Sequence, residues 1–316
     1  MGLHLRRKVA LLLFAITAVG CNMPSTRFPV PGYTGQPSPS AEESPRNLPT
    51  PTTSSPTETP VVTPTPSLLT ADLLAVVFLE DGQPLNLYSA PGSENQVVST
   101  LSSHGSGITH TENYQEVEGN LWLELNIPNG GTAWADTSYL TTQVSSEKFC
   151  ADQRLNGLIS QMVEAIQQRD EEKLASLTSP IHGLSIRHEW WNPEVRIKSR
   201  DQMLILFSDD TSYNWGIQDG SGLPLQGSFS QVVLPGLDDG LQGYTQFCNT
   251  LEQGMAAGFT TGFVEWPFEY QNFNYVSLYR AAPPGDELNW RTWSIGIEYI
   301  GEEPYVVVMV QYHWEI

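Results

Sequence analysis

The stretch "NLWLELNIPNGGTAWADTSYL" (residues 120–140) contains two short alternating apolar–polar segments separated by a turn sequence. Asn129-Gly130 is a strong signal for a hairpin turn, because both residue types accept the positive φ that such turns need. The residues expected to pack on either side of the turn are Trp122, Leu125, Ile127 and Trp134. The stretch therefore predicts an antiparallel hairpin within a β domain.

Upstream, "QPLNLYSAPGSENQVVSTLSSHGSG" (residues 83–107) places Leu85 and Leu87 on one face of a strand. These residues resemble a bacterial SH3 domain, a small barrel of about five strands, whose first strand reads roughly Leu-Asn-Val-Arg-Ser-Gly-Pro-Gly. The family's closing Gly-Trp-Val and Ser-Tyr-Leu appear as Ala133-Trp134-Ala135 and Ser138-Tyr139-Leu140. The resemblance predicts an SH3-like barrel over residues 69–145, under a quarter of the chain.

The resemblance implies recognition of peptidoglycan stem peptides or other extended peptides, although some members of the family are only spacers. Tyr88 stands where the family usually has Arg, and Ala133 replaces a glycine, so the family's ligand site is not carried over. Tyr88, Tyr114 and Tyr139 could form an aromatic trough for a peptide or a sugar. The alternative is that Trp122 and Trp134 simply fill the core of the barrel.

The N-terminus has the order of a secretory signal: basic residues, then a short apolar run from Val9 to Val19. Ala18-Val19-Gly20-Cys21 resembles the lipobox of bacterial lipoproteins, which implies cleavage before Cys21 and acyl chains on that residue. An ordinary signal peptide with an incidental cysteine is the alternative. We therefore expect a signal peptide (1–20), a disordered Pro/Ser/Thr-rich tether (21–68) and an extracytoplasmic protein that is lipid-anchored to the membrane.

The formal net charge is -20, and residues 69–145 contain nine acids but neither Lys nor Arg. Residues 147–316 contain 23 acids and 10 bases, a net of -13. Such a field repels nucleic acid, so nucleic-acid binding is excluded.

Cys150 and Cys248 remain once Cys21 is assigned to the anchor, and export favours their pairing as a disulfide. A cysteine nucleophile is the alternative. The segment "TQFCNTLEQG" lacks the Asp-Cys-Ser-Gly setting of the cell-wall cysteine peptidases that often accompany bacterial SH3 domains.

The C-terminal part (146–316) predicts an α+β domain in which N-terminal helices precede an antiparallel sheet. Apolar residues at helical spacing predict an amphipathic helix of about four turns; they are Leu155, Leu158, Ile159, Met162, Val163 and Ile166. Asp170 is a candidate cap for a second helix that carries Leu174 and Leu177. The alternating segments "RTWSIGIEYI" and "YVVVMVQYHWEI", joined at Gly301–Pro304, predict a final antiparallel hairpin.

The opening "LISQMVEAIQQRDEEKLASLTSP" resembles the start of cone-shaped folds of the nuclear-transport-factor type, which wrap a curved sheet around a pocket. Other segments resemble an uncharacterised domain that occurs beside bacterial SH3 modules. Together the two parts give a mainly β plus α+β fold class.

Chemical motifs are weak in the C-terminal part. His182 and His188 have no usual zinc spacing, and His313 is expected on a solvated strand face with Gln311 and Glu315. Asp209-Asp210 and Asp219-Gly220-Ser221-Gly222 lack the period of a calcium loop, so no metal and no cofactor are predicted. Arg280 and Arg291, both beside aromatic residues, are candidates for carboxylate or sugar binding; neutralising internal acids is the alternative.

No catalytic residue is singled out, because neither a Gly-x-Ser-x-Gly elbow nor a selected carboxylate pair is present. We therefore favour a non-enzymatic binding protein for envelope material, with peptidoglycan or envelope proteins as partners. A hydrolase or isomerase acting in a C-terminal pocket, and a structural spacer or assembly protein, remain as alternatives.

Overall fold

The computed structural model describes residues 67–128, 130–254 and 264–314. These residues fall within one compact unit of the chain, residues 61–316. Strands predominate over helices in them, which agrees with a mainly β and α+β class. The predicted signal peptide, Cys21 and almost all of the predicted tether lie outside the described residues.

Residues 67–142, here called the N-terminal β region, contain a five-stranded sheet of order β3-β2-β6-β5-β4 and a separate β1–β7 pair. The elements are η1 (Ser67–Thr70), β1 (Leu74–Val76), β2 (Leu85–Tyr88), β3 (Val97–Leu101), β4 (His110–Val117), β5 (Asn120–Asn126), β6 (Thr132–Asp136), η2 (Thr137–Tyr139) and β7 (Leu140–Thr142). All pairings in this region are antiparallel.

The hairpin predicted from residues 120–140 is formed by β5 and β6, which pair Leu123 with Ala135 and Leu125 with Ala133. These four residues are buried in the core of the region. Asn129, which was predicted to form the turn, lies outside the described residues.

The short helix η1 begins at Ser67, within the last two residues assigned to the predicted tether. Leu68 is 1% exposed and belongs to the core of the N-terminal β region.

Residues 143–314, the C-terminal α/β region, contain a six-stranded sheet of order β12-β13-β14-β15-β8-β9. Its strands are β8 (Leu184–Arg187), β9 (Val195–Ile197), β12 (Thr245–Cys248), β13 (Asn274–Arg280), β14 (Arg291–Ile300) and β15 (Glu303–His313). The remaining elements are α1 (Ser146–Ala151), α2 (Arg154–Gln168), α3 (Glu171–Leu177), α4 (Arg200–Met203), β10 (Tyr213–Ile217), β11 (Pro224–Gly227), α5 (Phe229–Val232), α6 (Leu234–Gly240) and η3 (Phe268–Tyr270).

The expected final hairpin is β14 and β15, but the expectation of a wholly antiparallel sheet is wrong. β15 pairs with β14 on one side and runs parallel to β8 on the other. A parallel neighbour needs a long crossover, and the more than one hundred residues between β8 and β15 supply it.

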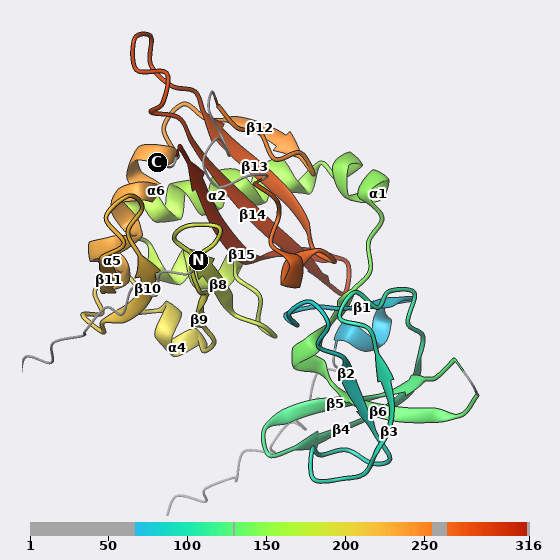
Figure 1. Ribbon diagram of the computed structural model, residues 1–316. Coiled ribbons are helices and arrows are strands. Elements are labelled where there is room, and N and C mark those ends of the chain that lie inside the picture. Colours follow the sequence, from blue (N-terminus) through green and yellow to red (C-terminus); the bar gives the residue numbers. More distant parts are fainter. Residues whose placement is uncertain (1–66, 129, 255–263, 315–316) are drawn as a thin grey trace, which may run out of the picture. The chain divides into compact units, whose positions relative to one another are not determined.

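The predicted amphipathic helix is α2, and all six of its predicted apolar positions are buried. Asp170 caps α3 as expected, with its side chain accepting a hydrogen bond from the backbone N–H of Lys173 at 2.9 Å. Figure 1 shows α2 lying across one face of the six-stranded sheet. We call this the helix-covered face.

Both faces of the central strands are covered. Trp293 and Ile295 of β14 belong to the cluster on the helix-covered face, whereas Val310 and Tyr312 of β15 belong to a second cluster with Trp290. The polar residues that alternate along these strands are therefore enclosed as well; Ser294, Glu298 and Gln311 are each at most 2% exposed.

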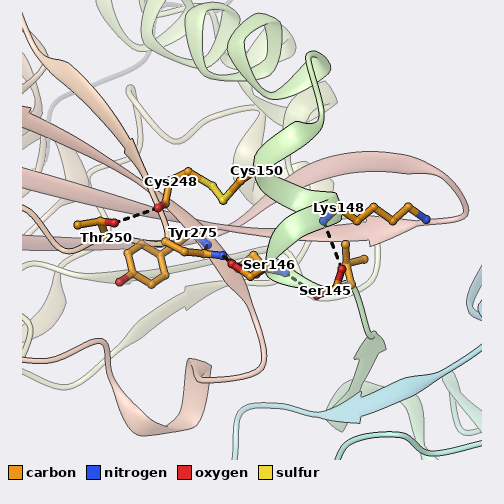
Figure 2. The surroundings of a disulfide bond; sticks show 10 residues. Ser145, Ser146, Lys148, Cys150, Cys248, Thr250 and Tyr275 are labelled. Carbon is orange, nitrogen blue, oxygen red and sulfur yellow. Dashed lines mark hydrogen bonds between the residues drawn. A yellow bond between two sulfur atoms is a disulfide. The ribbon is translucent and has the colours of Figure 1, made fainter.

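Cys150 and Cys248, the pair expected from the sequence, form a disulfide with their Cα atoms 5.8 Å apart. The bond ties α1 to β12 (Figure 2). Beside it, the Asn249 side chain donates to Ser146 Oγ at 2.8 Å and to Asn274 Oδ1 at 2.7 Å. Covalent and non-covalent links therefore hold the same junction.

Candidate functional site

A cavity of about 290 Å³ opens on the N-terminal β region; we call it the aromatic pocket. Its lining residues are Leu79, Pro84, Leu85, Asn86, Tyr88, Ser93, Asn120, Trp122, Asp136 and Tyr139. The ring of Tyr88 meets that of Trp122 edge to face, with centroids 5.5 Å apart and planes at 80°. This is a favourable arrangement for two aromatic rings, and it leaves other ring surface towards the cavity.

The alternation of side chains along the strands explains why these two rings lie outside the apolar cluster that forms the core of the N-terminal β region. Leu123 and Leu125 point inward, so Trp122 points to the opposite face of β5. Its partner in β6 is Asp136, whose carboxylate accepts from the backbone N–H of Ser138 at 2.9 Å and so caps η2. That cap positions Tyr139 beside the pocket.

The structure separates the three tyrosines that were predicted to act together. Tyr88 and Tyr139 line the aromatic pocket, but Tyr114, on β4, does not and is 47% exposed. The aromatic pocket therefore contains two of the three tyrosines, and Tyr114 is not among its lining residues. Trp122 is buried but belongs to none of the apolar core clusters, and Trp134 is half-buried opposite Tyr88.

The electrostatics of the aromatic pocket are acidic. Asp136 is its only carboxylate, and no Lys or Arg occurs in residues 69–145. Binding there must come from ring surfaces and from the polar groups of Asn86, Ser93 and Asn120, without help from a cation.

A second cavity, of about 330 Å³, lies at one end of the helix-covered face; we call it the polar pocket. Its lining residues are His188, Glu189, Val232, Pro235, Gly236, Arg291, Gln311 and His313. They come from the segment after β8, from α5 and α6, from the first residue of β14 and from the end of β15. Residues far apart in the sequence thus converge because β15 lies between β14 and β8.

Glu189, which is 5% exposed, lies between two histidines. Its Oε2 is 2.7 Å from His313 Nε2, and its Oε1 is 3.6 Å from His188 Nε2. The shorter contact is an ion pair without an aligned hydrogen bond, because Oε2 has no well-directed donor among the described residues. The other ring nitrogen of His313 contacts the Trp314 carbonyl oxygen at 2.6 Å.

The two histidines have opposite pKa shifts. Burial is the main reason that the pKa of His188 is lowered; Glu189 opposes the shift, and the positive charges of His313 and Arg291 add to it. Burial also acts to lower the pKa of His313. The contact with Glu189, the negative charge of Glu189 and the contact with the Trp314 carbonyl together outweigh burial, so the pKa of His313 is raised. The pocket therefore shifts His188 towards its neutral form and His313 towards its charged form.

The two arginines that were singled out in the sequence share one carboxylate. Arg291 Nε and Arg280 Nη2 contact Asp239 Oδ2 at 2.6 and 3.0 Å. With its amide oriented to satisfy both neighbours, Gln311 accepts from Arg291 Nη1 at 3.3 Å and donates to the His188 carbonyl at 2.9 Å. Arg291 lines the polar pocket, whereas Arg280 does not.

The expectation of a solvated face for His313 and Gln311 is wrong. Gln311 is 2% exposed and the His313 side chain 18%, because β15 is an interior strand and α5 and α6 cover this end of the sheet. Glu315 lies outside the described residues. Glu189 was not predicted as a site residue, because no sequence motif marks it; it directly follows the half-buried His188 beyond the end of β8.

His182, Glu298 and Ser179 form a buried cluster whose residue types match a catalytic triad, but whose geometry does not. In a triad the serine hydroxyl bonds the histidine. Here Ser179 Oγ donates to Glu298, while the two ring nitrogens of His182 contact Glu298 Oε2 at 2.7 Å and the Thr137 carbonyl at 3.2 Å. The cluster therefore serves packing, with the side chains of His182 and Glu298 each 1% exposed.

Within the described ranges 67–128, 130–254 and 264–314, no group of three or more His, Cys, Asp or Glu has an arrangement that could hold a metal ion. The helices of this described part include none that is long and apolar enough to cross a membrane. No protein-family model, curated protein or solved structure matches the chain. The two pockets are therefore interpreted from their own chemistry.

Proposed function

We propose that this protein is an extracytoplasmic lipoprotein, anchored to the membrane through Cys21, whose N-terminal β region is an SH3-like barrel that binds cell-envelope material. The ligand is an extended peptide or glycan, such as a peptidoglycan fragment. The signal and lipobox-like residues support the anchor, and the motifs over residues 69–145 support the barrel.

The aromatic pocket is the observation that carries the binding proposal. Its volume of about 290 Å³ suits part of an extended ligand rather than a large cofactor. Tyrosine and tryptophan rings have flat, amphipathic surfaces that contact peptide planes and sugar rings at a small cost in side-chain entropy. Two partly exposed tyrosines around a buried tryptophan provide such a surface.

The acidic surroundings determine how binding depends on salt. A carboxylate-rich ligand meets the nine acids of residues 69–145 and no base, so screening by salt lowers the repulsion. Affinity for such a ligand should change little or increase slightly with ionic strength. A basic ligand should respond in the opposite way.

For the C-terminal α/β region we propose a cone-shaped fold of the nuclear-transport-factor type. Support comes from the order of its elements, with α2 and α3 preceding a sheet that they cover on one face. This part of the proposal concerns fold and assigns no activity.

The test is calorimetric titration of the chain without its predicted leader, residues 22–316, with soluble peptidoglycan fragments at low and high salt. The double variant Tyr88→Ala/Tyr139→Ala loses two ring contacts, each worth about 0.5–1.5 kcal/mol, so affinity should fall roughly 5- to 150-fold. Tyr114→Ala is the matched control, because it removes an exposed tyrosine outside the pocket, and it should bind as the unaltered chain does. Absence of binding, or an equal loss in Tyr114→Ala, would favour the structural-spacer alternative.

A further inference from the structure

The polar pocket combines an open cavity with a concentration of positive charge that is unusual for this chain. The register pairs Arg280 with Arg291 across β13 and β14, and Arg291 with His313 across β14 and β15. Paired residues of antiparallel strands project from the same face, so the three basic side chains form one row. Residues 147–316 around them contain 23 acids against 10 bases.

The row is only partly neutralised. Asp239 contacts both arginines, and Glu189 contacts His313. Three positive groups thus face two carboxylates when His313 is protonated, while burial keeps His188 neutral near pH 7. The local balance is one positive charge within a strongly negative region.

Donor capacity remains at the cavity wall. An arginine has five N–H donors, and the contacts of Arg291 with Asp239 and Gln311 use its Nε and Nη1 atoms. Its side chain is 29% exposed and that of His313 is 18% exposed, so both remain reachable from the cavity. A guanidinium fork beside an imidazolium is well suited to an oxyanion.

We propose that the polar pocket is a binding site for a small oxyanion, a carboxylate or a phosphate group, with Arg291 as its direct ligand and the charged His313 ring adding electrostatic attraction while its own N–H groups contact Glu189 and Trp314. Arg280 lies next to Arg291 in the row and adds positive charge without lining the cavity. Glu189 is a positioning residue that fixes the His313 ring. The cavity of about 330 Å³ restricts the ligand to a small molecule or to one group of a larger one.

The site has a pH signature that a simple arginine site lacks. His313 contributes charge only while it is protonated, and the groups that face it are Glu189, Arg291 and the neutral His188. Anion affinity should be greatest below the raised pKa of His313 and should fall by up to about tenfold per pH unit above it. Bound anion should in turn raise the pKa of His313.

The experiment titrates residues 22–316 with sodium phosphate and with succinate, and uses succinamide as the uncharged analogue of succinate. Calorimetry measures affinity between pH 5.5 and 8.5, and NMR follows the His188 and His313 ring signals. At least one anion should bind, succinamide should not, and the tighter of the two anions identifies the oxyanion class.

Arg291→Gln should weaken binding about tenfold or more, and Arg291→Lys should recover part of it. His313→Gln should bind more weakly and lose the pH dependence, which a purely structural role would not predict. Arg200→Gln, an exposed base outside the polar pocket, is the matched control. Failure of both anions to shift the ring signals, or equal binding by the Arg291→Gln and control variants, would overturn the proposal.

Discussion

Removal of the Cys150–Cys248 disulfide should destabilise the protein mainly through its unfolded state. The bond closes a loop with a sequence separation of 98 residues. For a loop of about 100 residues, the chain-entropy model gives a loss of about 4.7 kcal/mol at 25 °C when the link is removed. In the folded state, the bonds of Asn249 to Ser146 and Asn274 remain and hold the same junction.

The assay is urea and thermal unfolding of residues 22–316, comparing the unaltered chain with Cys150→Ala/Cys248→Ala. The double variant should lose about 4–5 kcal/mol of unfolding free energy, equivalent to roughly 8–20 °C in Tm for a unit of this size. The unaltered chain in reductant should match the double variant. Asn249→Ala leaves the disulfide but removes three side-chain hydrogen bonds, with Ser146, Asn274 and the backbone N–H of Tyr275. At about 0.5–1.5 kcal/mol each, their loss should cost roughly 1.5–4.5 kcal/mol, and reductant should destabilise this variant further.

A loss below about 1 kcal/mol in the double variant, with no effect of reductant on the unaltered chain, would refute this reasoning. It would mean that the bond does not form in the folded protein, or that the unfolded chain is already constrained. An Asn249→Ala variant that loses no further stability in reductant would also contradict the predicted role of the disulfide.

Two further predictions concern the anchor and an acidic side chain. Cys21→Ser should release the exported protein from the membrane fraction or leave it unprocessed, and equal recovery in membranes without lipid label on the unaltered chain would contradict the anchor. The Asp152 carboxylate contacts Arg154 Nη2 at 2.7 Å and accepts from the Tyr299 hydroxyl at 2.8 Å. The Arg154 contact is the main reason that the pKa of Asp152 is lowered. A lowered pKa means that the stabilisation is present above the ordinary value near 3.9 and is lost as pH falls through the folded-state value. Asp152→Asn should therefore cost about 1 kcal/mol of unfolding free energy at pH 7 and progressively less below about pH 4. Urea midpoints of the variant and the unaltered chain, measured from pH 7 to pH 2, should converge in this way. A difference between the two midpoints that stays constant with pH would contradict the prediction.

Sequence patterns predicted correctly those elements whose formation depends mainly on residues close by in the chain. The spacing of Leu155 to Ile166 identified α2, because an amphipathic helix buries one stripe whatever its neighbours are. Asp170 was recognisable as a cap because its role depends only on the next three residues. The β5–β6 hairpin also follows from alternation and a turn signal.

Non-local packing was not predictable in the same way. The parallel β15–β8 pair joins strands more than a hundred residues apart, and nothing near either strand specifies that partner. Gln311 and His313 were assigned to solvent because alternation separates two faces of a strand but does not show what covers them. Tyr114 and Tyr88 were alike in the sequence, and only the strand order places one at the aromatic pocket and the other away from it.

The most direct test of the binding proposal is the indole N–H signal of Trp122 during titration of ¹⁵N-labelled residues 22–316 with soluble peptidoglycan fragments. Trp122 contacts Tyr88 within the aromatic pocket, whereas Trp215 and Trp293 are buried in the C-terminal α/β region and act as internal references. The account predicts that the Trp122 signal moves in a saturable way while those of Trp215 and Trp293 stay in place. Saturable binding with an unmoved Trp122 signal would contradict it.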